Sequence, residues 1–217
     1  MAPKELLDAL PPLQRLALAY APRVSRGALL GLLALDTRLS GIVRAAHEPM
    51  LAQLRLAWWR EALAGTGAQR PGGEPLLAVL EHWPGSRDAL TGLVEGWEAM
   101  TGTAPLPPDA FMALAEARGR GFAALAGAGE FHEPALRLGR NWSLADIATH
   151  LTHPAERQSA LELARAQDWQ HAALPRRLRP LAVLHGLAAR AIWQDAPALN
   201  VTPGAVLAAM RIVLLGR

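Results

Sequence analysis

The chain has 217 residues, of which 51% are hydrophobic and 19% charged, a balance typical of a globular protein and not of a disordered one. Ala and Leu dominate and β-formers are scarce, so we expect an all-α fold in a single domain over residues 1–217. The net charge is only +3, the arginines are scattered and cysteine is absent, which argues against nucleic-acid binding, disulfides and zinc–thiolate sites.

The first residues carry two acids, Glu5 and Asp8, where a secretory signal peptide needs an uninterrupted apolar stretch. Nowhere do about 18 uncharged apolar residues follow one another, as a membrane-spanning helix requires. We therefore expect a cytoplasmic protein without a transmembrane segment.

Proline and glycine divide the sequence into about ten expected helices. The first is short and ends near Tyr20, and Ser25 is the expected N-cap of a second helix that runs to about Ala45. A third begins at Glu48-Pro49 and ends at Gly65, before a loop that reaches Gly73. The remaining helices are expected at about 75–83, 86–101, 108–127, 133–151, 154–167, 177–195 and 202–215.

One acid falls on the apolar face of the second expected helix. Leu29, Leu32, Leu33 and Leu39 recur at helical spacing, and Asp36 lies on the same stripe. A buried carboxylate must be paired, because an isolated buried charge is costly. Asp36 therefore either lines an internal cavity or forms a structural ion pair, which is the favoured reading, and Arg55 is its candidate partner.

The third expected helix carries Arg55, Trp58 and Trp59. Arg55 and Trp59 are four residues apart and share a face, so the guanidinium can pack on the indole. Neighbouring residues of a helix point about 100° apart, so one tryptophan can enter the core while the other packs on a neighbouring helix. The pattern is more typical of packing than of a ligand site.

Two groups of acids and histidines could be drawn as metal ligands. Asp146, His150 and His153 lie on one side of a helix, but Pro154 ends that helix and the strong His-x₃-His spacing with a further acid is missing. Glu95 and Glu98 are more typical of a solvated face. We expect no metal site at either group.

Several runs resemble the squalene/phytoene synthase family: residues 34–39, Glu48-Pro49, and 53–63 with its Leu-Arg-Leu-Ala-Trp-Trp-Arg-Glu-Ala-Leu sequence. Residues 93–98 and 138–147 are similar to later cavity helices of that family, and the resemblance covers about residues 15–190. It implies an isoprenoid-synthase-like bundle of helices around a central apolar cavity. The candidate cavity-lining residues are then Asp36, Arg55, Trp58, Trp59, Asn141, Asp146 and His150.

The chain departs from the family's catalytic pattern. Active members join two prenyl diphosphates head to head and hold them through Mg²⁺ on two aspartate-rich motifs, whereas here no two acids lie four residues apart. Asp36 alone remains near the first motif, and Asp146, Thr149 and His150 stand where the second would follow. The chain is in this respect similar to degenerate members, which include a mitochondrial assembly factor for respiratory complex I.

The resemblance therefore implies a non-catalytic protein without cofactor that binds an apolar or isoprenoid ligand or a protein partner. The alternative is a Mg²⁺-dependent prenyltransferase with atypical ligands drawn from Asp36, Glu95, Glu98, Asp146 and His150. The apolar run 205–215 could dock on a partner or at a membrane surface, but closing the core is the favoured reading.

Overall fold

The computed structural model of the chain describes residues 2–46, 48–65, 73–193 and 202–215. Within these ranges the protein contains eleven α-helices, two short 3-10 helices and no strand, which confirms the expected all-α class. The bounds are α1 Ala2–Ala9, α2 Pro12–Ala19, α3 Arg23–Ala45, α4 Pro49–Ala64, α5 Pro75–Leu80, α6 Asp88–Glu98, η2 Ala99–Thr101, α7 Pro108–Ala126, α8 His132–His150, α9 Pro154–Arg165, η3 Arg176–Leu178, α10 Arg179–Trp193 and α11 Pro203–Leu215.

Two local expectations at the N-terminal end need correction. The first expected helix is two helices, because Pro12 starts a new one, α2, after α1 has ended. Ser25 is not an N-cap: Pro22 holds that position, and the Ser25 hydroxyl donates back to the Pro22 carbonyl from within the first turn of α3. Most of the expected Gly65–Gly73 loop, residues 66–72, lies outside the described residues.

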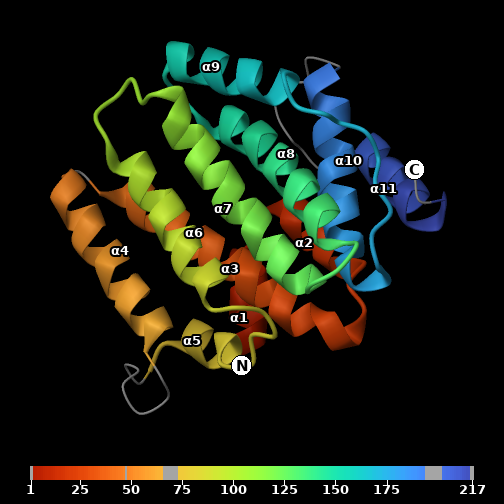
Figure 1. Cartoon of the computed structure of the whole chain (residues 1–217), viewed down its shortest axis with the longest axis horizontal. Helices are drawn as coiled ribbons and strands as arrows, with labels where there is room; N and C mark the ends of the chain where they lie inside the picture. Colours follow the sequence, from red (N-terminus) through yellow and green to blue (C-terminus); the bar gives the residue numbers. More distant parts are fainter. Residues whose placement is uncertain (1, 47, 66–72, 194–201, 216–217) are drawn as a thin grey trace.

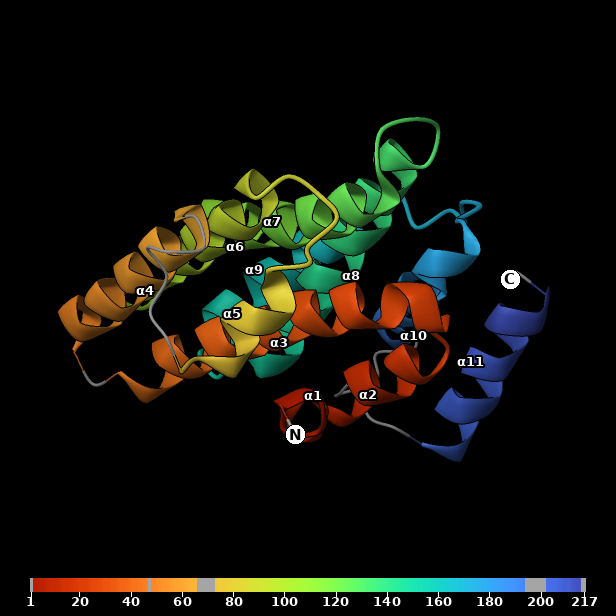
Figure 2. The same ribbon diagram turned by 90° about the horizontal axis from the view of Figure 1, so that it is seen from below.

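The helices form two packed layers (Figures 1 and 2). Helices α6, α7 and α8 lie side by side, with α4 on the outer side of α6 and α10 on the other side of α8. Figure 2 shows α3 and α5 in the layer beside them, together with α1 and α2. Helix α3 is the common neighbour, because it packs on α4, α5, α6 and α7 as well as on α1 and α2.

Helices α7 and α8 are in backbone contact at two glycines. A Cβ atom on Gly119 would lie 2.6 Å from the Leu136 carbonyl oxygen, and one on Gly139 would lie 2.9 Å from the Gly119 Cα atom. No side chain fits between the two helices there. The close approach brings the residues that follow on α8 within reach of Arg118, the neighbour of Gly119 on α7.

The last helix, α11, packs on α10, where Ile212 lies against Gly186 and Ala209 is fully buried. Its other face leaves Leu207 and Met210 exposed. One side of α11 thus packs inward, as favoured from the sequence. None of the described helices combines the length and the apolar character that crossing a bilayer requires.

Candidate functional site

A buried arginine connects three helices at the centre of the fold. Arg118 is 5% exposed and lies on the inward face of α7. Its Nε donates a hydrogen bond of 2.8 Å to Oδ1 of Asp36 on α3, and its Nη1 donates one of 3.0 Å to Oδ2 of Asp146 on α8. Nη1 also lies 3.2 Å from the Ser143 hydroxyl. One guanidinium therefore forms ion pairs with two carboxylates from opposite sides of the bundle.

Two tryptophans complete the surroundings of the guanidinium. Its carbon lies 5.2 Å from the ring centroid of Trp97 on α6 and 5.4 Å from that of Trp142 on α8. Both distances are in the range of a cation–π interaction. The indole N–H of Trp97 also donates a hydrogen bond of 2.9 Å to Oδ1 of Asp36, the oxygen that Arg118 Nε binds. The buried carboxylate of Asp36 therefore accepts two hydrogen bonds from the protein itself.

The charges in this cluster hold the arginine protonated. Burial lowers the pKa of Arg118, but the negative charges of Asp36 and Asp146 and their hydrogen bonds outweigh it, so the pKa is raised above its usual value. Two carboxylates and one guanidinium leave a formal charge of −1. This interior site is therefore not electropositive.

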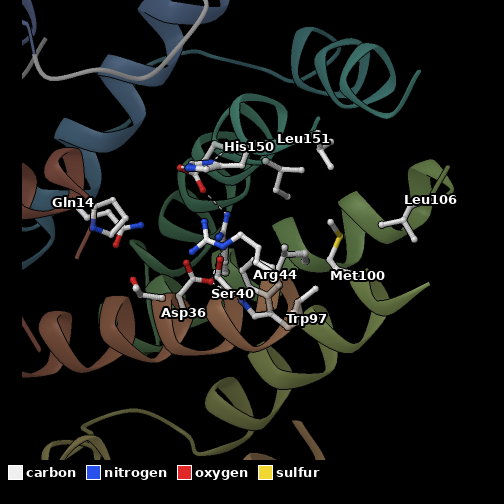
Figure 3. Close-up of a pocket in the computed structure, with 16 residues that line it drawn as sticks. Gln14, Asp36, Ser40, Arg44, Trp97, Met100, Leu106, His150 and Leu151 are labelled. Carbon is white, nitrogen blue, oxygen red and sulfur yellow. Dashed lines mark hydrogen bonds and ion pairs between the residues drawn. The ribbon is translucent and has the colours of Figure 1, made fainter. Parts of the chain in front are cut away.

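A cavity of about 260 Å³ lies against the Arg118 cluster (Figure 3). Five of its lining residues lie on α3, between Asp36 and Arg44. At a rise of 1.5 Å per residue, this stretch of the helix is about 12 Å long. The lining consists of Pro11, Gln14, Asp36, Thr37, Ser40, Val43, Arg44, Trp97, Met100, Leu106, Leu114, Arg118, Asp146, Ile147, His150 and Leu151.

The two ends of the cavity differ in chemistry. Figure 3 shows Gln14 at one side of the cavity, and Met100 and Leu106 at the other. Of the α3 residues labelled there, Asp36 lies nearest to Gln14. Gln14 is only 4% exposed, while Arg44 is exposed at the far end of the α3 segment. Apolar side chains from α3, α7, α8 and the segment after α6 line the space between.

Three of the residues singled out in the sequence line this cavity: Asp36, Asp146 and His150. Asp36 is buried and ion-paired, but its partner is Arg118, so the expected partner Arg55 was wrong. His150 is half exposed at the rim, where its Nδ1 lies 2.8 Å from the backbone carbonyl oxygen of Asp146 and 3.7 Å from its carboxylate.

The other four candidates lie outside the cavity. Arg55 is exposed and lines a separate surface depression. Trp59 is 4% exposed and belongs to the core, whereas Trp58 is 40% exposed, and the two rings meet edge to face at 5.1 Å. Asn141 is fully buried, but its Nδ2 donates to the Asp168 carbonyl and so ties the segment after α9 to α8.

The acids named for the prenyltransferase alternative do not gather. Glu98 forms an ion pair with Arg60 at 3.0 Å, and Glu95 is exposed. Neither lines the cavity that contains Asp36 and Asp146. Across the part of the chain that the structure describes, no three His, Asp or Glu side chains are close enough to hold a metal ion together.

Reading the sequence missed two residues of the site, Arg118 and Gln14. The signal for Arg118 was present, because it shares the apolar stripe of Phe111, Leu114 and Phe122, just as Asp36 shares the stripe of its own helix. Gln14 gave a weaker signal, since it lies beside Leu13, Ala17 and Leu18, the buried side of the short helix α2.

Of the comparisons with known proteins, one found a match. No curated protein and no solved structure matches the chain. The family model of squalene/phytoene synthase matches residues 15–118, a segment that contains Asp36, Trp97 and Arg118. Residues 15–118 are therefore similar to the squalene/phytoene synthase family.

Proposed function

We propose that the chain is a single-domain, cytoplasmic, non-catalytic member of this family that binds one apolar ligand in the cavity along α3. The observation that carries the proposal is the double ion pair of Arg118 with Asp36 and Asp146. These are the two carboxylates that the family resemblance assigns to the neighbourhood of the two aspartate-rich motifs. Here they neutralise a side chain of the protein.

The coordination chemistry of magnesium supports this proposal. Mg²⁺ prefers six oxygen ligands at about 2.0–2.1 Å and is usually held by carboxylates together with substrate phosphates. The guanidinium of Arg118 already lies 2.8 and 3.0 Å from the two carboxylates, and it would repel a second cation. Displacing it would leave a buried arginine without its partners, at a cost of about 3–5 kcal/mol. The residues of this site do not fit a magnesium-bound diphosphate.

The size of the cavity supports a single ligand. A cavity of about 150 Å³ accommodates benzene, with six heavy atoms. By the same ratio a cavity of about 260 Å³ accommodates about ten heavy atoms. One ten-carbon isoprenoid is of this size, whereas the two prenyl chains of a head-to-head condensation exceed it.

The experiment combines a test for turnover with a test for binding. The purified protein is incubated with geranyl or farnesyl diphosphate and Mg²⁺, and the products are analysed by mass spectrometry. We expect no head-to-head product. Formation of such a product, lost on Asp36→Asn substitution, would favour the prenyltransferase alternative and overturn the proposal.

Binding is measured with the ten-carbon isoprenoids geraniol and myrcene, through tryptophan fluorescence, since Trp97 lines the cavity. Val43→Trp fills the cavity and should abolish saturable binding. Val24→Trp, on the same helix at a site 93% exposed, is the matched control and should bind normally. Equal binding by both variants would contradict the assignment of the ligand to this cavity.

A role as an assembly factor stays a prediction from the resemblance. Deletion of the gene and analysis of the respiratory complexes tests it: intact complexes would remove its support.

A further inference from the structure

Gln14 has a buried side-chain oxygen to which no described residue donates a hydrogen bond. Its side chain is on α2 and lines the cavity, and its residue is only 4% exposed. Its Oε1 is shielded from solvent and accepts no hydrogen bond from any described residue. Leaving such a group unpaired costs about 1–3 kcal/mol, so buried amides in folded proteins almost always have a partner. The oxygen therefore marks a position where a hydrogen-bond donor of a ligand would be stabilised.

The charge near Gln14 disfavours an anionic group at this position. Asp36, Arg118 and Asp146 together carry a formal charge of −1 and all line the same cavity. The other arginine in the lining, Arg44, is about 12 Å from Asp36 along α3 and is exposed. A diphosphate beside Gln14 would face two carboxylates whose single counter-charge is already engaged, whereas the hydrogen of a neutral hydroxyl group would meet no repulsion.

The rest of the lining suits a hydrocarbon chain. It is contributed by Val43, Met100, Leu106, Leu114, Ile147 and Leu151. A chain of about ten carbons buried among such side chains gains about 25 cal/mol for each Å² of apolar surface removed from water. In Figure 3 Met100 and Leu106 lie on the far side of Trp97 from Gln14.

We infer that the cavity selects a neutral isoprenoid-sized molecule with a hydroxyl head group, which donates a hydrogen bond to Oε1 of Gln14 while its chain lies along α3. This inference rests on the proposed function and adds to it the chemical class of the head group. The preferred ligand is thus an alcohol, and neither the corresponding diphosphate nor the plain hydrocarbon.

The test compares three ten-carbon probes on the full chain: geraniol with a hydroxyl, geranyl diphosphate with an anionic head and myrcene with no polar group. We expect geraniol to bind about five- to tenfold more tightly than myrcene, as one net hydrogen bond allows. Geranyl diphosphate should bind more weakly than geraniol, with or without Mg²⁺.

Gln14→Met keeps the length of the side chain and removes the amide. It should lower the affinity for geraniol to that for myrcene and leave the affinity for myrcene unchanged. Gln53→Leu, an exposed glutamine on α4 outside the cavity lining, is the matched control and should change neither. The comparison of probes on the unmodified protein tests the inference even if Gln14→Met does not fold.

The outcomes separate this inference from the proposed function. If none of the probes binds, the proposed function falls. If myrcene or geranyl diphosphate binds as tightly as geraniol, the cavity binds apolar ligands but the head-group inference is overturned. It is also overturned if Gln14→Met folds and retains the preference for geraniol.

Discussion

The substitution Arg118→Met tests the charge cluster directly. Methionine replaces the arginine stem as far as Nε and carries no charge, so the variant leaves Asp36 and Asp146 in place without their shared counter-charge. It also removes the cation that packs on Trp97 and Trp142, while the hydrogen bond from Trp97 to Asp36 can persist. The substitution therefore removes the two ion pairs, the two ring contacts and the hydrogen bond to the Ser143 hydroxyl.

The expected loss of stability follows from the burial of the two acids. Removing one partner of a buried ion pair costs about 3–5 kcal/mol because the other charge remains buried. The side chains of Asp36 and Asp146 are 5% and 14% exposed, so water can relieve neither charge fully. We expect Arg118→Met to lower the free energy of unfolding by about 4–5 kcal/mol at neutral pH. This is a large part of the roughly 5–15 kcal/mol that a typical domain has.

Urea denaturation followed by circular dichroism measures the effect. The matched control is Arg120→Met on the same helix, whose ion pair with Glu116 is half exposed and 3.6 Å long, and whose loss should cost under about 0.5 kcal/mol. Adding Asp36→Asn and Asp146→Asn to Arg118→Met should restore most of the lost stability, because no buried charge then remains. A loss of less than about 1 kcal/mol in Arg118→Met would refute the reasoning.

Two further predictions concern the helix contact behind the site and a buried histidine. Gly119→Ala should lower the free energy of unfolding by about 1–3 kcal/mol, because the added Cβ would meet the Leu136 carbonyl oxygen. Gly27→Ala, at a position of α3 with open space around it, is the control and should raise the free energy of unfolding by about 0.5–1 kcal/mol. Equal effects of the two substitutions in thermal denaturation would contradict the glycine contact. Burial lowers the pKa of His185 to about 4, with the charges of His171 and Arg137 adding to the effect. In the unfolded chain His185 is protonated below about pH 6.5, whereas in the folded protein it stays neutral down to about pH 4. The stability that neutral His185 contributes is therefore complete above about pH 6.5, and about 3 kcal/mol of it is lost as the pH falls toward 4. Urea unfolding between pH 7 and about 4 measures it, and the same pH dependence in His185→Phe would show that this histidine is not responsible.

The helix boundaries could be predicted well because proline marks them. Six α-helices have proline as their first residue, where its missing N–H costs no hydrogen bond: Pro12, Pro49, Pro75, Pro108, Pro154 and Pro203. The boundary that was missed, between α1 and α2, also has this signal, in a Pro11-Pro12 pair within a segment too short for the periodicity of either helix to stand out.

The partner of Asp36 could not be predicted, for a physical reason. Helical periodicity shows which face of a helix points inward, and it placed Asp36 correctly among buried leucines. It does not show which helices face one another. Arg118 is 82 residues further along the chain, and Arg55, one helix away, was the nearer choice in sequence alone. Gln14 shows a similar limit, because its oxygen is shielded from solvent only where α2 packs on helices such as α10, far along the chain.

The positive charge that neutralises Asp36 and Asp146 is the side chain of Arg118 and not a bound ion. The occupancy of a bound ion depends on its concentration and falls when a chelator competes for it. A side chain on a packed helix instead has an effective concentration near its partners that depends only on how the helices are positioned. Here that geometry is the glycine contact between α7 and α8 next to Arg118. The charge cluster is therefore complete once α3 has also packed on α7, and its composition is the same whatever ions the surroundings supply.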